Sequence, residues 1–159
     1  MPQGSFTNHF ASKESFGLEI IGRYFDGSCA MFDRTLRNEA LPPLQRLSAY
    51  IDASTERLNE AGMRHGCLFG NFIAEASEHS EAIRSRVVEL LAQLESMVAS
   101  CLRAAVAAGE LAQDFDCEEI AAFVVASLQG ATLLAKAQRS SAPVQRFKHV
   151  LFTRILTRP

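Results

Sequence analysis

One long helix, which we expect Ser80 to cap and which ends near Gly109, constrains the fold of this chain more than any other stretch. Its apolar positions step by four and three residues, which is the spacing of helices packed closely side by side. They are Ile83, Val87, Leu90, Leu94, Met97 and Cys101, and a second row of Leu91, Val98 and Leu102 widens the buried face. A helix buried on more than one side needs several neighbours. Strand-like alternation is absent, so we expect an all-α fold.

Proline, glycine and capping residues divide the rest of the chain into further helices. We expect these over residues 12–38, 42–61, 67–75, 116–140 and 141–156. Gly27 and Ser28 bend or divide the first of them. Asp116 and Glu119 have the spacing of a capping box, with Asp116 as the N-cap residue.

The last two expected helices are apolar on nearly all sides, which one small core cannot satisfy. Small residues at Ala126 and Gly130 would let another helix approach closely. We therefore predict a homodimer in which each subunit contributes two helices to a four-helix interface. The interface residues we expect are Val124, Leu128, Ala131, Phe147, Leu151 and Ile155.

The chain opens with a short helix pattern that leads directly into the expected helix at 12–38. Phe6 and Phe10 lie four residues apart and share one face, which can anchor the short helix. The other faces carry small hydrogen-bonding groups, a combination that suits a helix in the major groove of DNA. Ser12 then caps the next helix, with Glu14 in its first turn.

The motif Pro-x-Gly-Ser-Phe-x-x-His-Phe-x-Ser-Lys-Glu, from Pro2 to Glu14, resembles the end of the DNA-binding domain of TetR/AcrR-type transcriptional regulators. The resemblance implies a recognition helix within 1–11, which is a remnant of a helix-turn-helix domain. Residues 12–159 would then be the ligand-binding and dimerisation domain, with 12–38 as the connecting helix. The resemblance implies that Gln3, Gly4 and Ser5 contact bases and that Thr7, His9 and Lys13 contact phosphates. It also places Asn8 among the DNA-binding residues. Thr7 and Asn8 depart from the residues usual in the family.

No expected helix precedes the recognition helix, although a helix-turn-helix unit needs one. A start site assigned inside the gene, a trimmed polypeptide or a natural truncation would each account for this. We expect the polypeptide to dimerise but to bind operator DNA weakly or not at all. One function would be a regulator that releases DNA in response to an inducer. The alternative is a DNA-independent dimerisation module that titrates full-length relatives by pairing with them.

A second resemblance involves Gly66-Cys67-Leu68 with Asn71, and the later run from Ala135 to Ser140. Both resemble a branch of the TetR/AcrR family that includes regulators responding to electrophile stress. The resemblance implies a repressor that releases DNA when a small, electrophilic inducer binds or reacts. The pocket residues we expect are Tyr50, Cys67, Asn71, Met97, Gln129, Leu133 and Lys136.

Cys67 lies at or next to an expected helix N-terminus, where unpaired backbone N–H groups favour a negative charge on sulfur. Three interpretations stay open: an inert buried residue, a covalent or redox sensor, and a residue that only lines a pocket. Lys136 either reaches solvent from its helix end or meets Cys67. An enzyme with Cys67 as nucleophile and His65 as base is not expected, because residues two apart across such a junction rarely face each other.

Composition limits the remaining classes of function. The formal net charge of −2 argues against general nucleic-acid coating but permits a local DNA contact. No apolar run looks long enough to span a bilayer, so we expect a cytoplasmic protein without a membrane partner. The four cysteines form no Cys-x-x-Cys pair, so no metal site, cofactor or disulfide framework is predicted.

Overall fold

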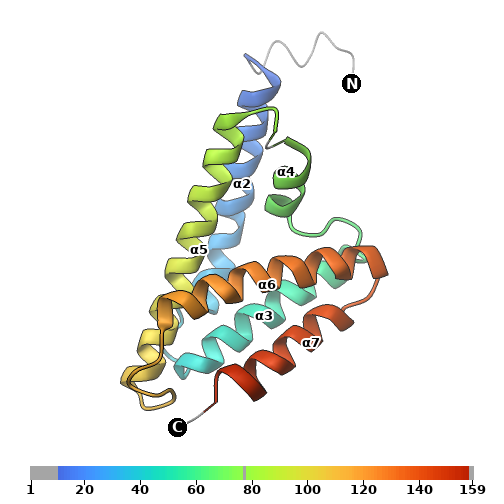
Figure 1. Ribbon diagram of the computed structural model, residues 1–159. Coiled ribbons are helices and arrows are strands. Elements are labelled where there is room, and N and C mark those ends of the chain that lie inside the picture. Colours follow the sequence, from blue (N-terminus) through green and yellow to red (C-terminus); the bar gives the residue numbers. More distant parts are fainter. Residues whose placement is uncertain (1–10, 77, 158–159) are drawn as a thin grey trace.

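The computed structural model describes residues 11–76 and 78–157, and within these ranges the chain is helical without any strand (Figure 1). The all-α prediction is therefore confirmed. The helices are α2 (Lys13–Arg34), α3 (Pro43–Glu60), α4 (Leu68–Ala76), α5 (Glu81–Ala107), α6 (Cys117–Gln138) and α7 (Ala142–Val150), which continues into a π-helical turn, η1 (Leu151–Ile155). The predicted DNA contacts at Gln3, Gly4, Ser5, Thr7, Asn8 and His9 lie outside the described residues.

Two long helices, α2 and α5, run side by side along the length of the molecule (Figure 1). Helices α3, α6 and α7 form a stack across its lower half, and α4 lies beside the upper half of α2 and α5. The predicted apolar face of α5 is buried from Ile83 to Leu102, except that Leu91 and Met97 are only partly covered. This burial makes α5 the central helix that the four-and-three spacing indicated.

The helix starts follow local capping chemistry. The Ser80 side chain accepts a hydrogen bond from the N–H of Ile83, and the Asp116 carboxylate accepts one from the N–H of Glu119, so both predicted N-caps are confirmed. The sequence left open whether Gly27 and Ser28 bend or divide this helix. In the structure, α2 runs through both residues without a break. The Ser28 hydroxyl instead donates to the carbonyl of Tyr24 at 2.9 Å, which satisfies the hydroxyl inside a continuous helix.

The packing of α6 and α7 corrects which residues are available to a partner. Val124, Leu128 and Leu151, expected in an interface, are buried inside the subunit. Their side chains belong to the main core because they point towards the neighbouring helices of the same chain. The opposite face exposes Phe123, Leu134 and Val150, and a groove between α6 and α7 is lined by these residues together with Ala131, Phe147 and Ile155.

Both α5 and α6 contain stretches that are long and apolar enough to cross a membrane by length and composition. The expectation that the chain holds no such stretch is therefore wrong on this criterion. Core helices of water-soluble proteins meet the same criterion. Here α5 and α6 pack against each other and contribute many residues to the main core.

Candidate ligand-binding cavity

A cavity of about 290 Å³ lies where α2, α3, α4, α5 and α6 meet. Aromatic rings form much of its wall: Tyr24 meets Phe69 edge-on with 5.2 Å between ring centroids, and Phe32 lies 6.0 Å from Tyr50. Its polar groups come from Ser28, Ser54, Arg57, His65, Cys67, Gln129 and Thr132, together with the two tyrosines. An apolar enclosure with a few polar groups is the usual form of a small-molecule site.

The lining residues of α2 and α3 follow helical spacing. On α3, Tyr50, Ser54 and Arg57 are four and three residues apart and so lie on one face. On α2, Tyr24, Ser28 and Met31 have the same spacing. The cavity is therefore the gap between two helix faces, closed by Leu94 of α5 and by Leu128, Gln129 and Thr132 of α6.

Cys67 lines the cavity immediately before the first residue of α4, and its carbonyl accepts the N–H of Asn71 at 3.1 Å. The preceding Gly66 has φ +65°, a left-handed conformation that favours glycine. A Cβ atom at Gly66 would lie 3.1 Å from Cδ of Lys136, so the loop passes very close to α6. This close approach fixes where the Cys67 side chain enters the cavity.

Lys136 and Asn71 hold the Cys67 loop. The Lys136 ammonium donates to Asn71 Oδ1 at 2.9 Å, and Asn71 Nδ2 donates to the carbonyl of His65 at 2.8 Å. One residue beyond α6, Arg139 donates to the carbonyl of Met63 at 3.3 Å. The two alternatives for Lys136 were that it reaches solvent or that it meets Cys67. The structure supports neither, because the ammonium donates to Asn71.

The structure brings together part of the expected site. Tyr50, Cys67 and Gln129 line the cavity, and Asn71 and Lys136 support its loop from outside. Met97 lies on another face, in a separate hollow beside Cys101. Leu133 is 62% exposed and does not line the cavity, because one helical step separates it from the lining residue Thr132. Ligand contacts by this set stay a prediction.

Tyr24 connects Cys67 to α2. Its hydroxyl lies beside Cys67 and the backbone of Leu68. Burial, and then the neighbouring Cys67, raises the pKa of the Tyr24 phenol, whereas the nearby Arg57 cation acts in the opposite direction. Burial and Cys67 also raise the pKa of Tyr50. Both phenols therefore remain protonated donors at neutral pH.

The other three thiols lie outside the cavity lining. Burial raises the pKa of the Cys101 thiol to about 11, and the thiol donates to the carbonyl of Pro43 at 2.9 Å. Burial also raises the pKa of Cys117. Cys29 is half-buried, and its thiol faces the carbonyl of Phe25 on its own helix at 3.7 Å.

Sequence reasoning missed Tyr24 and Arg57, although both follow the periodic faces described above. Arg57 lies with its guanidinium carbon 4.6 Å from the Tyr24 ring centroid and donates to the Ser28 hydroxyl at 3.0 Å. The signal available was the recurrence of polar residues on the otherwise apolar faces of two helices. In the described residues, no group of three or more His, Cys, Asp or Glu side chains could hold a metal ion.

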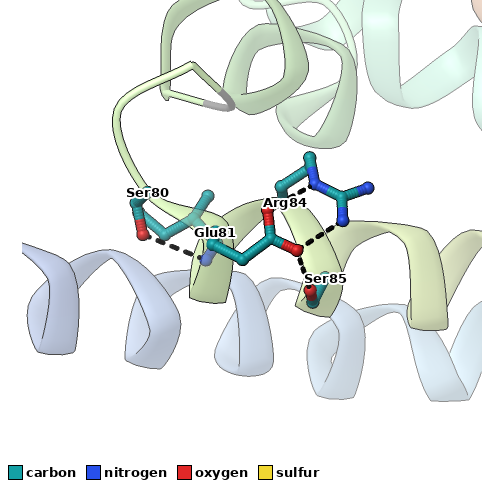
Figure 2. A network of polar contacts seen from close by, with 5 residues as sticks. Ser80, Glu81, Arg84 and Ser85 are labelled. Carbon is teal, nitrogen blue, oxygen red and sulfur yellow. Dashed lines mark hydrogen bonds and ion pairs between the residues drawn. The ribbon is translucent and has the colours of Figure 1, made fainter.

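The upper end of α2 is tied to the start of α5. Ser80 donates to the Glu14 carboxylate at 2.6 Å while its oxygen caps α5 through the N–H of Ile83. Figure 2 shows this end of α5, where Glu81 pairs with Arg84 and accepts from Ser85. The Ser80–Glu14 hydrogen bond therefore joins α2 to the start of α5.

Comparison with known proteins decides the family. A family model described as "Tetracyclin repressor-like, C-terminal domain" matches residues 43–151. The HTH-type transcriptional repressor DhaR of Mycobacterium sp. (strain GP1) is 33% identical over 156 residues, which are 98% of this chain and 77% of DhaR. This chain belongs to the TetR/AcrR family of transcriptional regulators.

Solved structures agree with this assignment. The crystal structure of a TetR regulatory protein from Rhodobacter sphaeroides has a TM-score of 0.89 at 30% identity, covering 94% of this chain and 79% of that one. The reduced form of Escherichia coli NemR has a TM-score of 0.77 at 25% identity, covering 96% of this chain and 80% of that one. The TetR-like fold and the relationship to regulators, rather than to enzymes, are thus shown at the family level.

Proposed function

We propose that this protein is a cytoplasmic, homodimeric repressor that releases operator DNA when a small electrophile reacts with Cys67. The observation that carries the proposal is the position of Cys67, which lines an aromatic cavity together with Tyr24 of α2. Two relatives support the direction of regulation, because DhaR and NemR are both named as transcriptional repressors. The reduced form of NemR, a redox-defined state, supports a cysteine as the sensing group.

The chemistry is addition of sulfur to carbon. The Cys67 thiolate attacks the electrophilic carbon of a conjugated alkene, and a carbon–sulfur bond forms. The π electrons of the alkene move to the conjugated carbonyl oxygen, and the resulting enolate takes a proton from water. The product is a thioether that fills part of the cavity, and no oxidant is needed.

The new group would act on α2 because Cys67 and Tyr24 are in direct contact. The thioether is bulkier than the thiol, so it crowds the part of the cavity wall that Cys67 shares with Tyr24, and extra atoms in a packed site strain its surroundings. Packing transmits such a change, since a Cβ atom at Gly17 of α2 would lie 3.5 Å from Phe72 of α4 and 3.0 Å from Ile83 of α5. Helix α2 leads towards the recognition motif, and Lys13 lies in its exposed first turn.

Release of DNA by a thiol reagent tests the proposal. Fluorescence anisotropy at low salt, which strengthens the weak DNA binding expected of this polypeptide, would follow its binding to the intergenic DNA beside its own gene before and after N-ethylmaleimide. We expect the reagent to release DNA from the wild-type protein and from the matched control C29S, but not from C67S. Release from C67S as complete as from the wild type would contradict the proposal.

The same DNA-binding experiment tests the alternative function, a DNA-independent dimerisation module. A polypeptide that binds no intergenic fragment at low salt, yet forms mixed dimers with a full-length relative, would favour the DNA-independent module. Sequence-specific binding lost on alkylation would exclude it. The recognition contacts at Gln3, Gly4 and Ser5 are part of this proposal.

A further inference from the structure

We infer that the cavity selects anionic ligands, so that the electrophile captured at Cys67 carries a carboxylate that pairs with Arg57. This inference rests on the proposed function for its covalent step, but the selection of charge does not. Among the described residues that line the cavity, Arg57 is the one Lys or Arg, and none is Asp or Glu. The fixed charge that a ligand meets there is therefore positive.

Arg57 is held in place without being neutralised. Its guanidinium lies over the Tyr24 ring at 4.6 Å and donates one hydrogen bond to the Ser28 hydroxyl at 3.0 Å. Ring and hydroxyl are both uncharged, and no carboxylate among the described residues forms an ion pair with it. A planar guanidinium with one donor engaged keeps further donors for a carboxylate.

Two other arginines differ from Arg57 in having a carboxylate partner on their own helix. Arg23 pairs with Glu19 on α2, and Arg86 pairs with Glu89 on α5. Arg57 has Glu56 and Glu60 on its own helix, yet it turns towards the cavity and α2. Because Arg57 is exposed as a residue while it also lines the cavity, its charge lies where the cavity meets solvent.

The cavity volume and wall define the rest of the ligand. About 290 Å³ is at the small end of ligand pockets, which favours a molecule of on the order of ten non-hydrogen atoms. Tyr24, Phe32, Tyr50 and Phe69 offer aromatic surface to a flat apolar body. A short conjugated or aromatic carboxylate with an electrophilic carbon matches the charge, the walls and the thiol together.

Two alkylating agents of equal size separate charge from reactivity. Iodoacetate and iodoacetamide both form a carbon–sulfur bond with Cys67 as the carbon–iodine bond breaks and iodide leaves with the electron pair. Each rate at Cys67, measured by peptide mass spectrometry, would be divided by the rate with glutathione. We expect the wild-type protein to favour iodoacetate by about tenfold over glutathione's own preference, the effect of one charge-assisted hydrogen bond.

The variants assign the preference to Arg57. R57Q should lose it and R57K should retain part of it, whereas the control R64Q should keep it because Arg64 is exposed and does not line the cavity. The preference should also shrink as salt is raised, since Arg57 is open to solvent. Equal relative rates in the wild type and R57Q would overturn the inference.

A second experiment, with ligands that form no covalent bond, tests the selection of charge independently of the reactivity of Cys67. Benzoate and benzamide have the same shape and differ in charge, and their effect on thermal unfolding reports binding to the folded state. Benzoate should raise Tm of the wild type and not of R57Q, and benzamide should raise neither by as much. If Cys67 is unreactive but benzoate binds in this way, the sensor proposal fails and the charge selection stands. If benzoate stabilises R57Q as much as the wild type, the charge selection is wrong, whatever Cys67 does.

Discussion

At the scale of single residues, the junction before α4 depends on Gly66. Its φ of +65° is a left-handed conformation that costs other residues about 1 to 2 kcal/mol. The chain contains a matched comparison in Gly109, which has φ +73° but no atom within 4 Å of a Cβ position. Any difference between substitutions at the two sites therefore reports the close approach of Gly66 to Lys136.

We predict that G66A changes the rate at which Cys67 is alkylated, whereas G109A leaves that rate unchanged. Both should lower the free energy of unfolding by about 1 to 2 kcal/mol from backbone strain, with a larger loss for G66A. Urea unfolding and alkylation kinetics would measure both effects. Identical kinetics in the two variants would show that the Gly66 turn does not position Cys67.

Because the pKa of Cys101 is raised, we predict that the free energy of unfolding depends on pH. Burial raises the pKa of its thiol from an ordinary 9.0 to about 11 in the folded protein. Its contribution to stability is therefore complete below pH 9 and is lost as the pH rises towards 11, because the unfolded chain releases the proton first. The wild type should lose up to about 3 kcal/mol relative to C101A over this window. A constant difference between the two proteins in urea unfolding at pH 8 and at pH 10.5 would contradict this.

At the scale of helices, Ser80 performs two tasks in one place. It caps α5 through the N–H of Ile83 and donates to Glu14 at the start of α2. We predict that S80A lowers the free energy of unfolding by about 1 kcal/mol through the lost cap. S80D should retain the cap but repel Glu14, so that only the tie to α2 is lost.

Hydrogen exchange of the first turns of α2 measures that tie. Exchange there should accelerate in both S80A and S80D, whereas the start of α5 should become less protected only in S80A. Unchanged exchange at α2 in S80D would mean that the Glu14 contact does not hold the two helices together.

Helix ends were predictable from the sequence because caps are local. Ser80 and Asp116 cap the helices they were expected to cap, and the seam of α5 faces the core. Faces that meet across the molecule were not predictable in the same way. Arg57 was missed because its meeting with Tyr24 depends on how α3 packs on α2, and Leu133 was misplaced because the register of α6 against α4 sets which residues line the cavity.

At the scale of the whole molecule, the exposed groove between α6 and α7 is continuous with the main core and apolar in its lining. Our proposal of a homodimer places a second copy on this face, as expected when large apolar side chains remain exposed together. Leu134 and Val88 provide a matched pair, because each is 53% exposed but they lie on different helices.

We predict that L134E converts the dimer to a monomer and that V88E leaves it a dimer. A buried carboxylate without a partner is costly in an interface, whereas one on an exposed part of α5 is solvated. Light scattering after size-exclusion chromatography would give the mass of each species. Monomers from V88E and dimers from L134E would place the interface elsewhere.

We propose above all that Cys67, in the cavity beside α2, is the thiol that meets an incoming electrophile. The direct measurement is mass-spectrometric mapping of the folded protein after brief exposure to less than one equivalent of N-ethylmaleimide at neutral pH. We predict that Cys67 is labelled first, because Cys101 and Cys117 are buried thiols with raised pKa values and Cys29 does not line the cavity. Labelling of Cys29 or Cys101 ahead of Cys67 would contradict it.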